Sequence, residues 1–89
     1  QWVTDRYDNN IAYTDHAIGK LLDALSPDDV VVLLSDHGEE LWDHGDFEHG
    51  HSLYDELLRV PLIVRAPGVP AGVVKPPVSL LDVAPTLLD

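Results

Sequence analysis

The sequence predicts an α/β fold in which helices flank a partial, mostly parallel sheet. Residues 5–25 repeat apolar side chains in steps of three and four, which is typical of one face of a helix. Residues 30–34, VVVLL, form a continuous apolar run of the kind found in strands that are buried on both faces of a parallel sheet. A second predicted strand, residues 59–64 (RVPLIV), follows further along the chain, so helical and strand segments alternate.

The first half of the chain contains a helix, a strand and a loop. The helix over residues 5–25 is expected to stop before Pro27, which cannot continue it. The strand over residues 30–34 leads into residues 35–51, SDHGEELWDHGDFEHGH, where charged side chains and histidines predict a loop. Within this loop, we expect the acidic side chains between Glu40 and Glu48 to be solvated surface.

The second half predicts shorter elements. Ser52 is expected to cap a short helix with acidic residues in its first turn, ahead of the strand over residues 59–64. Residues 66–77 hold four of the seven prolines and predict a surface loop. A short strand over residues 78–80 and a last helix over residues 82–88, capped by its first residue, complete the α/β pattern.

Composition limits what the chain can bind. Sixteen acidic residues oppose five basic ones and give a net charge of −11, which argues against nucleic acid as a partner because phosphates require a basic face. No apolar run approaches the roughly 20 residues of a membrane span. The chain has no cysteine, so disulfides and thiolate zinc sites are excluded.

The loop over residues 35–51 is the candidate functional segment because it contains four of the five histidines. In open α/β sheets, ligands bind beyond the carboxyl ends of the strands, which is where Asp36 and His37 are expected. Both side chains could reach one cation if the chain turns at Gly38. Oxygen from Asp favours Ca²⁺, Mg²⁺ or Mn²⁺, and nitrogen from His favours Mn²⁺ or Zn²⁺. The alternative is an acidic solvated loop, and spacing alone does not separate a metal ligand from a substrate contact.

Five blocks of the sequence resemble the sulfatase family of the alkaline phosphatase superfamily. They cover residues 7–22, 30–41 (VVVLLSDHGEEL), 49–64 (HGHSLYDELLRVPLIV), 67–68 and 81–89 (LDVAPTLLD), in the order and spacing of that family. The resemblance implies an alkaline-phosphatase-like α/β fold. It also implies that residues 1–89 are a fragment of one catalytic domain, the C-terminal part.

The resemblance implies metal-dependent hydrolysis of sulfate esters, with a small-molecule or carbohydrate sulfate ester as the substrate. Asp36 and His37 match the two metal ligands of the family's S-D-H/N-G block. The family's usual ion is Ca²⁺, with Mg²⁺, Mn²⁺ and Zn²⁺ as the alternatives. His49 matches the residue that contacts the sulfate and assists the leaving oxygen, and His51 is the competing candidate. His44 is expected to be a solvent-exposed side chain of the variable loop.

The chain departs from the family in two respects that matter for activity. The family's upstream Asp pair, which completes the metal shell, is absent from residues 1–89, and so is the nucleophile. The family's nucleophile comes from a C/S-x-P/A-x-R motif that precedes these blocks, and residues 1–89 contain no such motif. The N-terminal half of the domain is therefore expected to be required, and the fragment alone to be inactive. The alternatives are a phosphonate or phosphodiester hydrolase, a phosphoethanolamine transferase of the same superfamily, or a non-catalytic cation-binding fragment.

Overall fold

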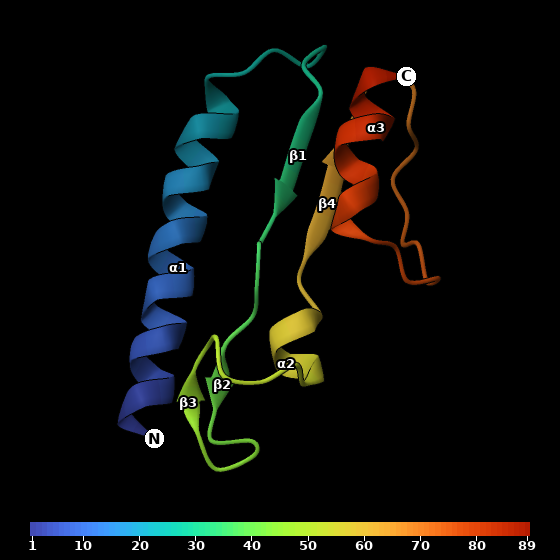
Figure 1. Cartoon of the computed structure of the whole chain (residues 1–89). Helices are drawn as coiled ribbons and strands as arrows, with labels where there is room; N and C mark the ends of the chain where they lie inside the picture. Colours follow the sequence, from blue (N-terminus) through green and yellow to red (C-terminus); the bar gives the residue numbers. More distant parts are fainter.

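A computed structural model describes all residues 1–89 and places two helices on either side of a pair of strands (Figure 1). The elements in chain order are α1 (Trp2–Asp23), β1 (Val31–Leu34), β2 (Glu40–Leu41), β3 (Phe47–Glu48), α2 (Asp55–Leu58), β4 (Leu62–Arg65), a 3₁₀ turn η1 (Leu80–Asp82) and α3 (Val83–Leu88). The mixture of helix and strand confirms the α/β content that the sequence predicts.

The predicted parallel sheet is wrong for these residues. β1 and β4 pair antiparallel, with Val31 opposite Arg65 and Leu34 opposite Leu62, and β2 pairs antiparallel with β3. A parallel pair needs a crossover that carries the chain back along the length of the first strand. The only helix between β1 and β4 is α2, whose four residues rise only about 6 Å. The chain therefore enters β4 at the end where it left β1.

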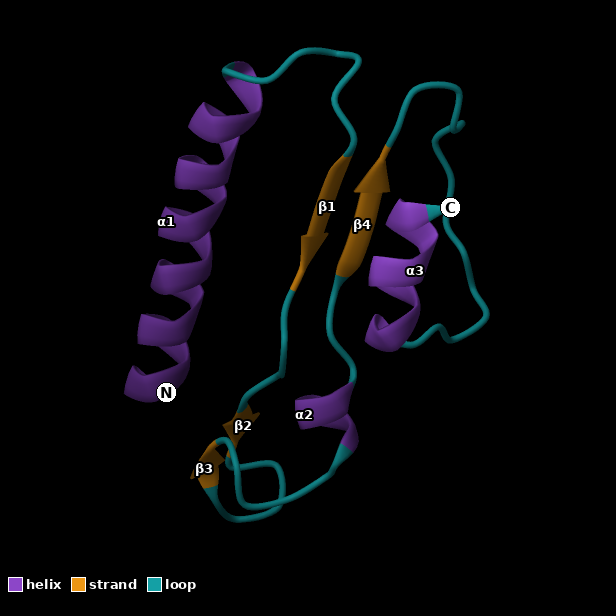
Figure 2. Cartoon of the chain, turned by 45° about the horizontal axis from the view of Figure 1, so that its top comes forward, coloured by secondary structure: helices purple, strands orange, loops and turns teal.

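Helix α1 lies alongside β1, and α3 lies on the other side, next to β4 (Figures 1 and 2). Helix α1 begins three residues earlier and ends two residues earlier than the apolar periodicity predicts. It ends before a turn in which the Ser26 N–H donates to Asp29 Oδ2 at 2.8 Å. Arg65 at the end of β4 donates to the Ser26 carbonyl at 3.2 Å, which ties this turn to the strand pair.

Two predictions for the caps are wrong. Helix α2 begins after Tyr54 without a side-chain cap, and the Ser52 hydroxyl is buried without a hydrogen-bond partner. At the C-terminus, residues 78–80 form no strand. Ser79 and Asp82 instead make a capping box, so Ser79 caps the turn that precedes α3. The Ser79 hydroxyl accepts from the Leu81 N–H at 3.2 Å, and Asp82 Oδ2 accepts from the Ser79 N–H at 3.4 Å.

The chain buries very little of itself. Leu57 of α2, which is 6% exposed, is the only buried apolar residue, and Glu40 of β2, 1% exposed, is the only buried polar one. Large apolar side chains on every major element remain exposed, among them Leu21, Leu34, Ile63 and Leu88. Apolar surface of this extent is characteristic of chains that pack against a further protein surface.

None of the helices combines the length with the apolar character that crossing a membrane requires.

Candidate functional site

Residues 35–58 gather beyond the end of the strand pair where β1 finishes and β4 begins (Figure 2). They comprise the turn after β1, the β2–β3 hairpin and α2. All four histidines of the segment lie within 4.0 Å of a carboxylate oxygen. The segment is therefore an array of imidazole–carboxylate pairs rather than an unstructured acidic loop.

The turn after β1 is held by short hydrogen bonds. The Ser35 hydroxyl donates to the His37 carbonyl at 2.6 Å, and the His37 N–H donates to Asp36 Oδ1 at 3.1 Å. Gly38 follows, and its N–H donates to the Leu57 carbonyl of α2 at 2.8 Å. A Cβ atom at Gly38 would overlap the Glu56 carbonyl oxygen, so only glycine allows the turn and α2 to approach this closely.

Asp36 and His37 present two donor atoms whose spacing suits one cation. His37 Nδ1 lies 2.7 Å from the Gly38 carbonyl oxygen, which can only accept, so Nδ1 carries the proton and Nε2 keeps its lone pair. His37 Nε2 lies 3.7 Å from Asp36 Oδ1. Metal–ligand bonds of about 2.0 to 2.4 Å allow atoms at this separation to bind the same ion. The Asp36 side chain is 87% exposed, so the position is accessible.

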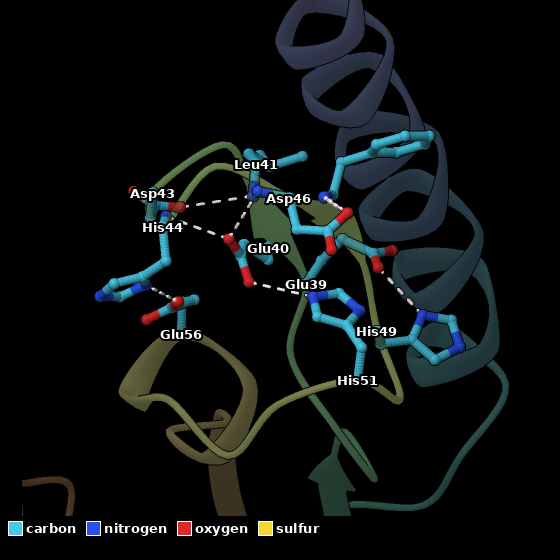
Figure 3. A network of polar contacts seen from close by, with 10 residues as sticks. Glu39, Glu40, Leu41, Asp43, His44, Asp46, His49, His51 and Glu56 are labelled. Carbon is cyan, nitrogen blue, oxygen red and sulfur yellow. Dashed lines mark hydrogen bonds and ion pairs between the residues drawn. The ribbon is translucent and has the colours of Figure 1, made fainter.

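His49 joins this pair, although it lies 12 residues further along the chain than His37. The two imidazole rings stack with their centroids 4.0 Å apart and their planes at 28°. His49 Nδ1 lies 2.9 Å from Glu39 Oε1 (Figure 3). The structure therefore brings together three of the four residues predicted from the sequence: Asp36, His37 and His49.

His51 lies in a different environment. Its Nε2 lies 3.1 Å from Oε2 of Glu40, whose other carboxylate oxygen accepts from the backbone N–H groups of His44 and Asp46 (Figure 3). Burial alone would raise the pKa of Glu40, but the hydrogen bond from His51 and the two backbone N–H groups outweigh burial and lower it. The same hydrogen bond raises the pKa of His51 against the opposing effect of desolvation. This arrangement makes His51 an internal partner of Glu40.

The prediction of a solvated surface between Glu40 and Glu48 is wrong at Glu40, because its carboxylate is the most buried group in the chain. His44 remains partly exposed but is not a free side chain. Its Nδ1 lies 2.6 Å from Glu56 Oε1, and its ring stacks on Tyr54 at 3.7 Å. Period-2 alternation would have signalled the hairpin, but strands of two residues are too short to show it.

A second cluster could hold a metal ion. One potential ligand atom from each of Glu40, His44 and Glu56 lies within 4.8 Å of the others. Sequence reasoning missed this group because its members come from β2, the hairpin loop and α2. The side chains of these three residues already make hydrogen bonds. The Glu40 carboxylate accepts three hydrogen bonds, and His44 is bonded to Glu56. Glu40 is also buried, whereas the Asp36 and His37 side chains are 87% and 44% exposed, so Asp36 and His37 are the more accessible pair.

The chain thus presents a carboxylate and two imidazoles at the end of a strand. A family model for sulfatases matches residues 3–89, and the chain belongs to the sulfatase family. This family implies an alkaline-phosphatase-like α/β fold.

Curated relatives agree with this assignment. An uncharacterised sulfatase of Escherichia coli, YidJ, is 36% identical over 80 residues, covering 85% of this chain and 16% of the relative. The choline-sulfatase of Rhizobium meliloti is 36% identical over 88 residues, covering 93% of this chain and 17% of the relative. Human arylsulfatase K is 39% identical over 84 residues, covering 88% of this chain and 16% of the relative. The chain thus spans about a sixth of the length of these relatives, and no solved structure matches it.

Proposed function

We propose that this chain is part of a sulfatase catalytic domain and contributes a metal half-site and a substrate contact to the hydrolysis of sulfate esters. The observation that carries the proposal is the convergence of Asp36, His37 and His49 at one strand end. The relatives whose names describe sulfatases match across nearly the whole chain, which supports sulfate as the group that is cleaved.

Asp36 Oδ1 and His37 Nε2 are the atoms proposed to hold a divalent cation. A bound cation supplies positive charge that polarises the ester and offsets the chain's own negative charge. Calcium takes about six to eight oxygen ligands, so two donors from this chain leave the remainder to water and to other parts of the domain. Ca²⁺ is the proposed ion, with Mn²⁺, Mg²⁺ and Zn²⁺ as the alternatives for a mixed oxygen and nitrogen pair.

His49 is the proposed substrate contact. Its Nε2 makes no hydrogen bond within the chain, and half of the side chain is exposed, so in the imidazolium form, with a proton on each nitrogen, Nε2 could donate its proton to the leaving oxygen. His51 is the weaker candidate because its Nε2 is engaged by buried Glu40. Glu40 and His51 instead hold the β2–β3 hairpin, from which His49 follows directly.

The nucleophile is proposed to come from the part of the domain beyond these residues. The exposed apolar surfaces of α1, β1, β4 and α3 are proposed to pack against that part. The chain alone should therefore show no turnover of a chromogenic sulfate ester, whereas the complete catalytic domain should hydrolyse it. Turnover by residues 1–89 alone would contradict this division. A preference of the complete domain for phosphonate or phosphodiester substrates would favour another branch of the superfamily.

Calorimetric titration with Ca²⁺ and Mn²⁺ tests the metal half-site directly. Asp36→Ala should weaken cation binding by about 10-fold or more, because it removes one of the two ligands that this chain supplies. Glu56→Gln is the matched control, since it removes a carboxylate from the second cluster and leaves Asp36 in place. The opposite ranking would move the cation to Glu40, His44 and Glu56.

A further inference from the structure

Glu39 directly follows the turn that carries the proposed metal ligands, and its carboxylate contacts His49 from 10 residues away. A carboxylate oxygen accepts a hydrogen bond, so at 2.9 Å the Nδ1 atom of His49 must be the donor. We propose that Glu39 is a positioning residue, which keeps a proton on Nδ1 of His49 and orients the ring, so that Nε2 is the nitrogen that takes up a proton and passes it to the leaving oxygen. This inference rests on the proposed role of His49 as the substrate contact.

The contact selects one tautomer and one ring orientation of His49. A neutral histidine side chain without such a contact has two tautomers and several accessible rotamers. A hydrogen bond at Nδ1 fixes both the location of the proton and the orientation of the ring. His37 contains the same arrangement, with Nδ1 bonded to the Gly38 carbonyl at 2.7 Å. The two stacked rings therefore each have Nδ1 occupied and Nε2 without a hydrogen bond.

The position of Glu39 couples the two halves of the site. Gly38 anchors the turn to α2 through its N–H and the Leu57 carbonyl, and Glu39 is the next residue. The Glu39 side chain is only 27% exposed, so its carboxylate has less freedom than a surface acid. Glu39 is therefore attached to the turn that carries Asp36 and His37, and its side chain contacts His49. It connects the proposed metal half-site to the proposed substrate contact.

Neighbouring acids do not provide the same contact. Glu40 is committed to His51 and to two backbone N–H groups, and Glu48, directly before His49, makes no hydrogen bond through its side chain. Glu39 is thus the one carboxylate placed to orient His49. Glu48→Gln is accordingly a matched control for the loss of one nearby negative charge.

Long-range ¹H–¹⁵N NMR correlations of the imidazole rings test the inference on the 89-residue chain. His49 should show the Nδ1–H tautomer. Glu39→Ala should shift it towards the Nε2–H tautomer, which predominates for a neutral histidine side chain in water. Glu39→Gln should retain most of the Nδ1–H signal because the amide oxygen still accepts, and Glu48→Gln should leave it unchanged. An Nε2–H tautomer in the unmodified chain would overturn the proposal, as would an Nδ1–H tautomer that survives Glu39→Ala.

Kinetics of the complete catalytic domain provide the second readout. Glu39→Ala should lower kcat by about 10- to 100-fold with little change in KM, the range typical for residues that orient a functional group, and Glu39→Gln should recover much of the loss. An equal kcat for Glu39→Ala and the unmodified domain would overturn the positioning role. Absence of sulfate ester turnover in the unmodified domain would instead contradict the proposed function, and the tautomer result would stand apart from it.

Discussion

Glu39–His49 and Glu40–His51 are two carboxylate–imidazole pairs built from neighbouring residues, yet they occupy opposite environments. Consecutive side chains of an extended backbone point to opposite faces, and this separates the two carboxylates. Glu40 is buried and accepts three hydrogen bonds, whereas Glu39 accepts one and faces the stacked rings of His37 and His49. The comparison assigns the inner pair, Glu40–His51, to structure and the outer pair, Glu39–His49, to the proposed chemistry.

The largest expected effect separates the two histidines by activity. In the complete catalytic domain, His49→Ala should reduce kcat by about 10²- to 10⁴-fold, the range for loss of a general acid. His51→Ala should retain more activity and should instead lower the unfolding temperature. Measuring kcat and thermal unfolding on both variants checks the assignment. If the two variants were equally stable and His51→Ala lost more kcat than His49→Ala, His51 would be the substrate contact and His49 the structural residue.

The next effect concerns stability. Here the inner pair, Glu40–His51, should matter more than the outer pair, Glu39–His49. Glu40→Gln should lower the free energy of unfolding more than Glu39→Gln, because it removes charge from a fully buried carboxylate whose partners remain inside. Denaturant unfolding of the two variants, each of which differs from the unmodified chain by one oxygen-to-nitrogen exchange, measures the difference. Equal losses would mean that burial does not distinguish the inner pair from the outer pair.

A smaller effect on stability is expected at Gly38, which directly precedes Glu39 and Glu40 and is hydrogen-bonded to α2. Gly38→Ala should cost about 1 to 3 kcal/mol of unfolding free energy, because the new methyl group must displace the backbone of α2. Gly72→Ala is the control, since nothing lies within 4 Å of a Cβ atom placed there. Equal stability of the two variants would show that α2 can move away without cost.

The main elements were predictable because their signals are local. Apolar periodicity located α1 to within three residues, and continuous apolar runs located β1 and β4. The direction of strand pairing was not predictable from them, because VVVLL is compatible with either direction and the connection between the strands decides it. Asp36 and His37 could be proposed as metal ligands because they directly follow a predicted strand.

The inner pair shows why the rest of the site was not predictable. Glu40 and His51 are 11 residues apart and belong to a run of charged side chains that reads as solvated surface. Their contact depends on the β2–β3 hairpin, which has two residues in each strand. The positive φ angles of Trp42 and Glu48, 73° and 74°, which help to shape that hairpin, occur in residues that rarely adopt them. Sequence patterns that rest on common backbone conformations cannot detect such a turn.

The pH dependence of stability gives the finest test of the inner pair. The raised pKa of His51 means that its contribution is complete below about pH 6.5 and is lost as the pH rises through the folded-state pKa. The lowered pKa of Glu40 means that its contribution is complete above about pH 4.5 and is lost as the pH falls through the folded-state pKa. The stability difference between the unmodified chain and His51→Gln should therefore be largest between about pH 4.5 and 6.5 and should shrink on both sides.

Denaturant unfolding at a series of pH values measures that difference, with Glu48→Gln as a variant that should keep the unmodified profile. The other ionisable groups of the chain are common to the unmodified chain and to His51→Gln, so their contributions cancel in the comparison. A difference that stays constant from pH 4 to 8 would show that His51 and Glu40 do not share a proton-dependent contact. The Glu40 carboxylate would then stabilise the hairpin only through the backbone N–H groups of His44 and Asp46.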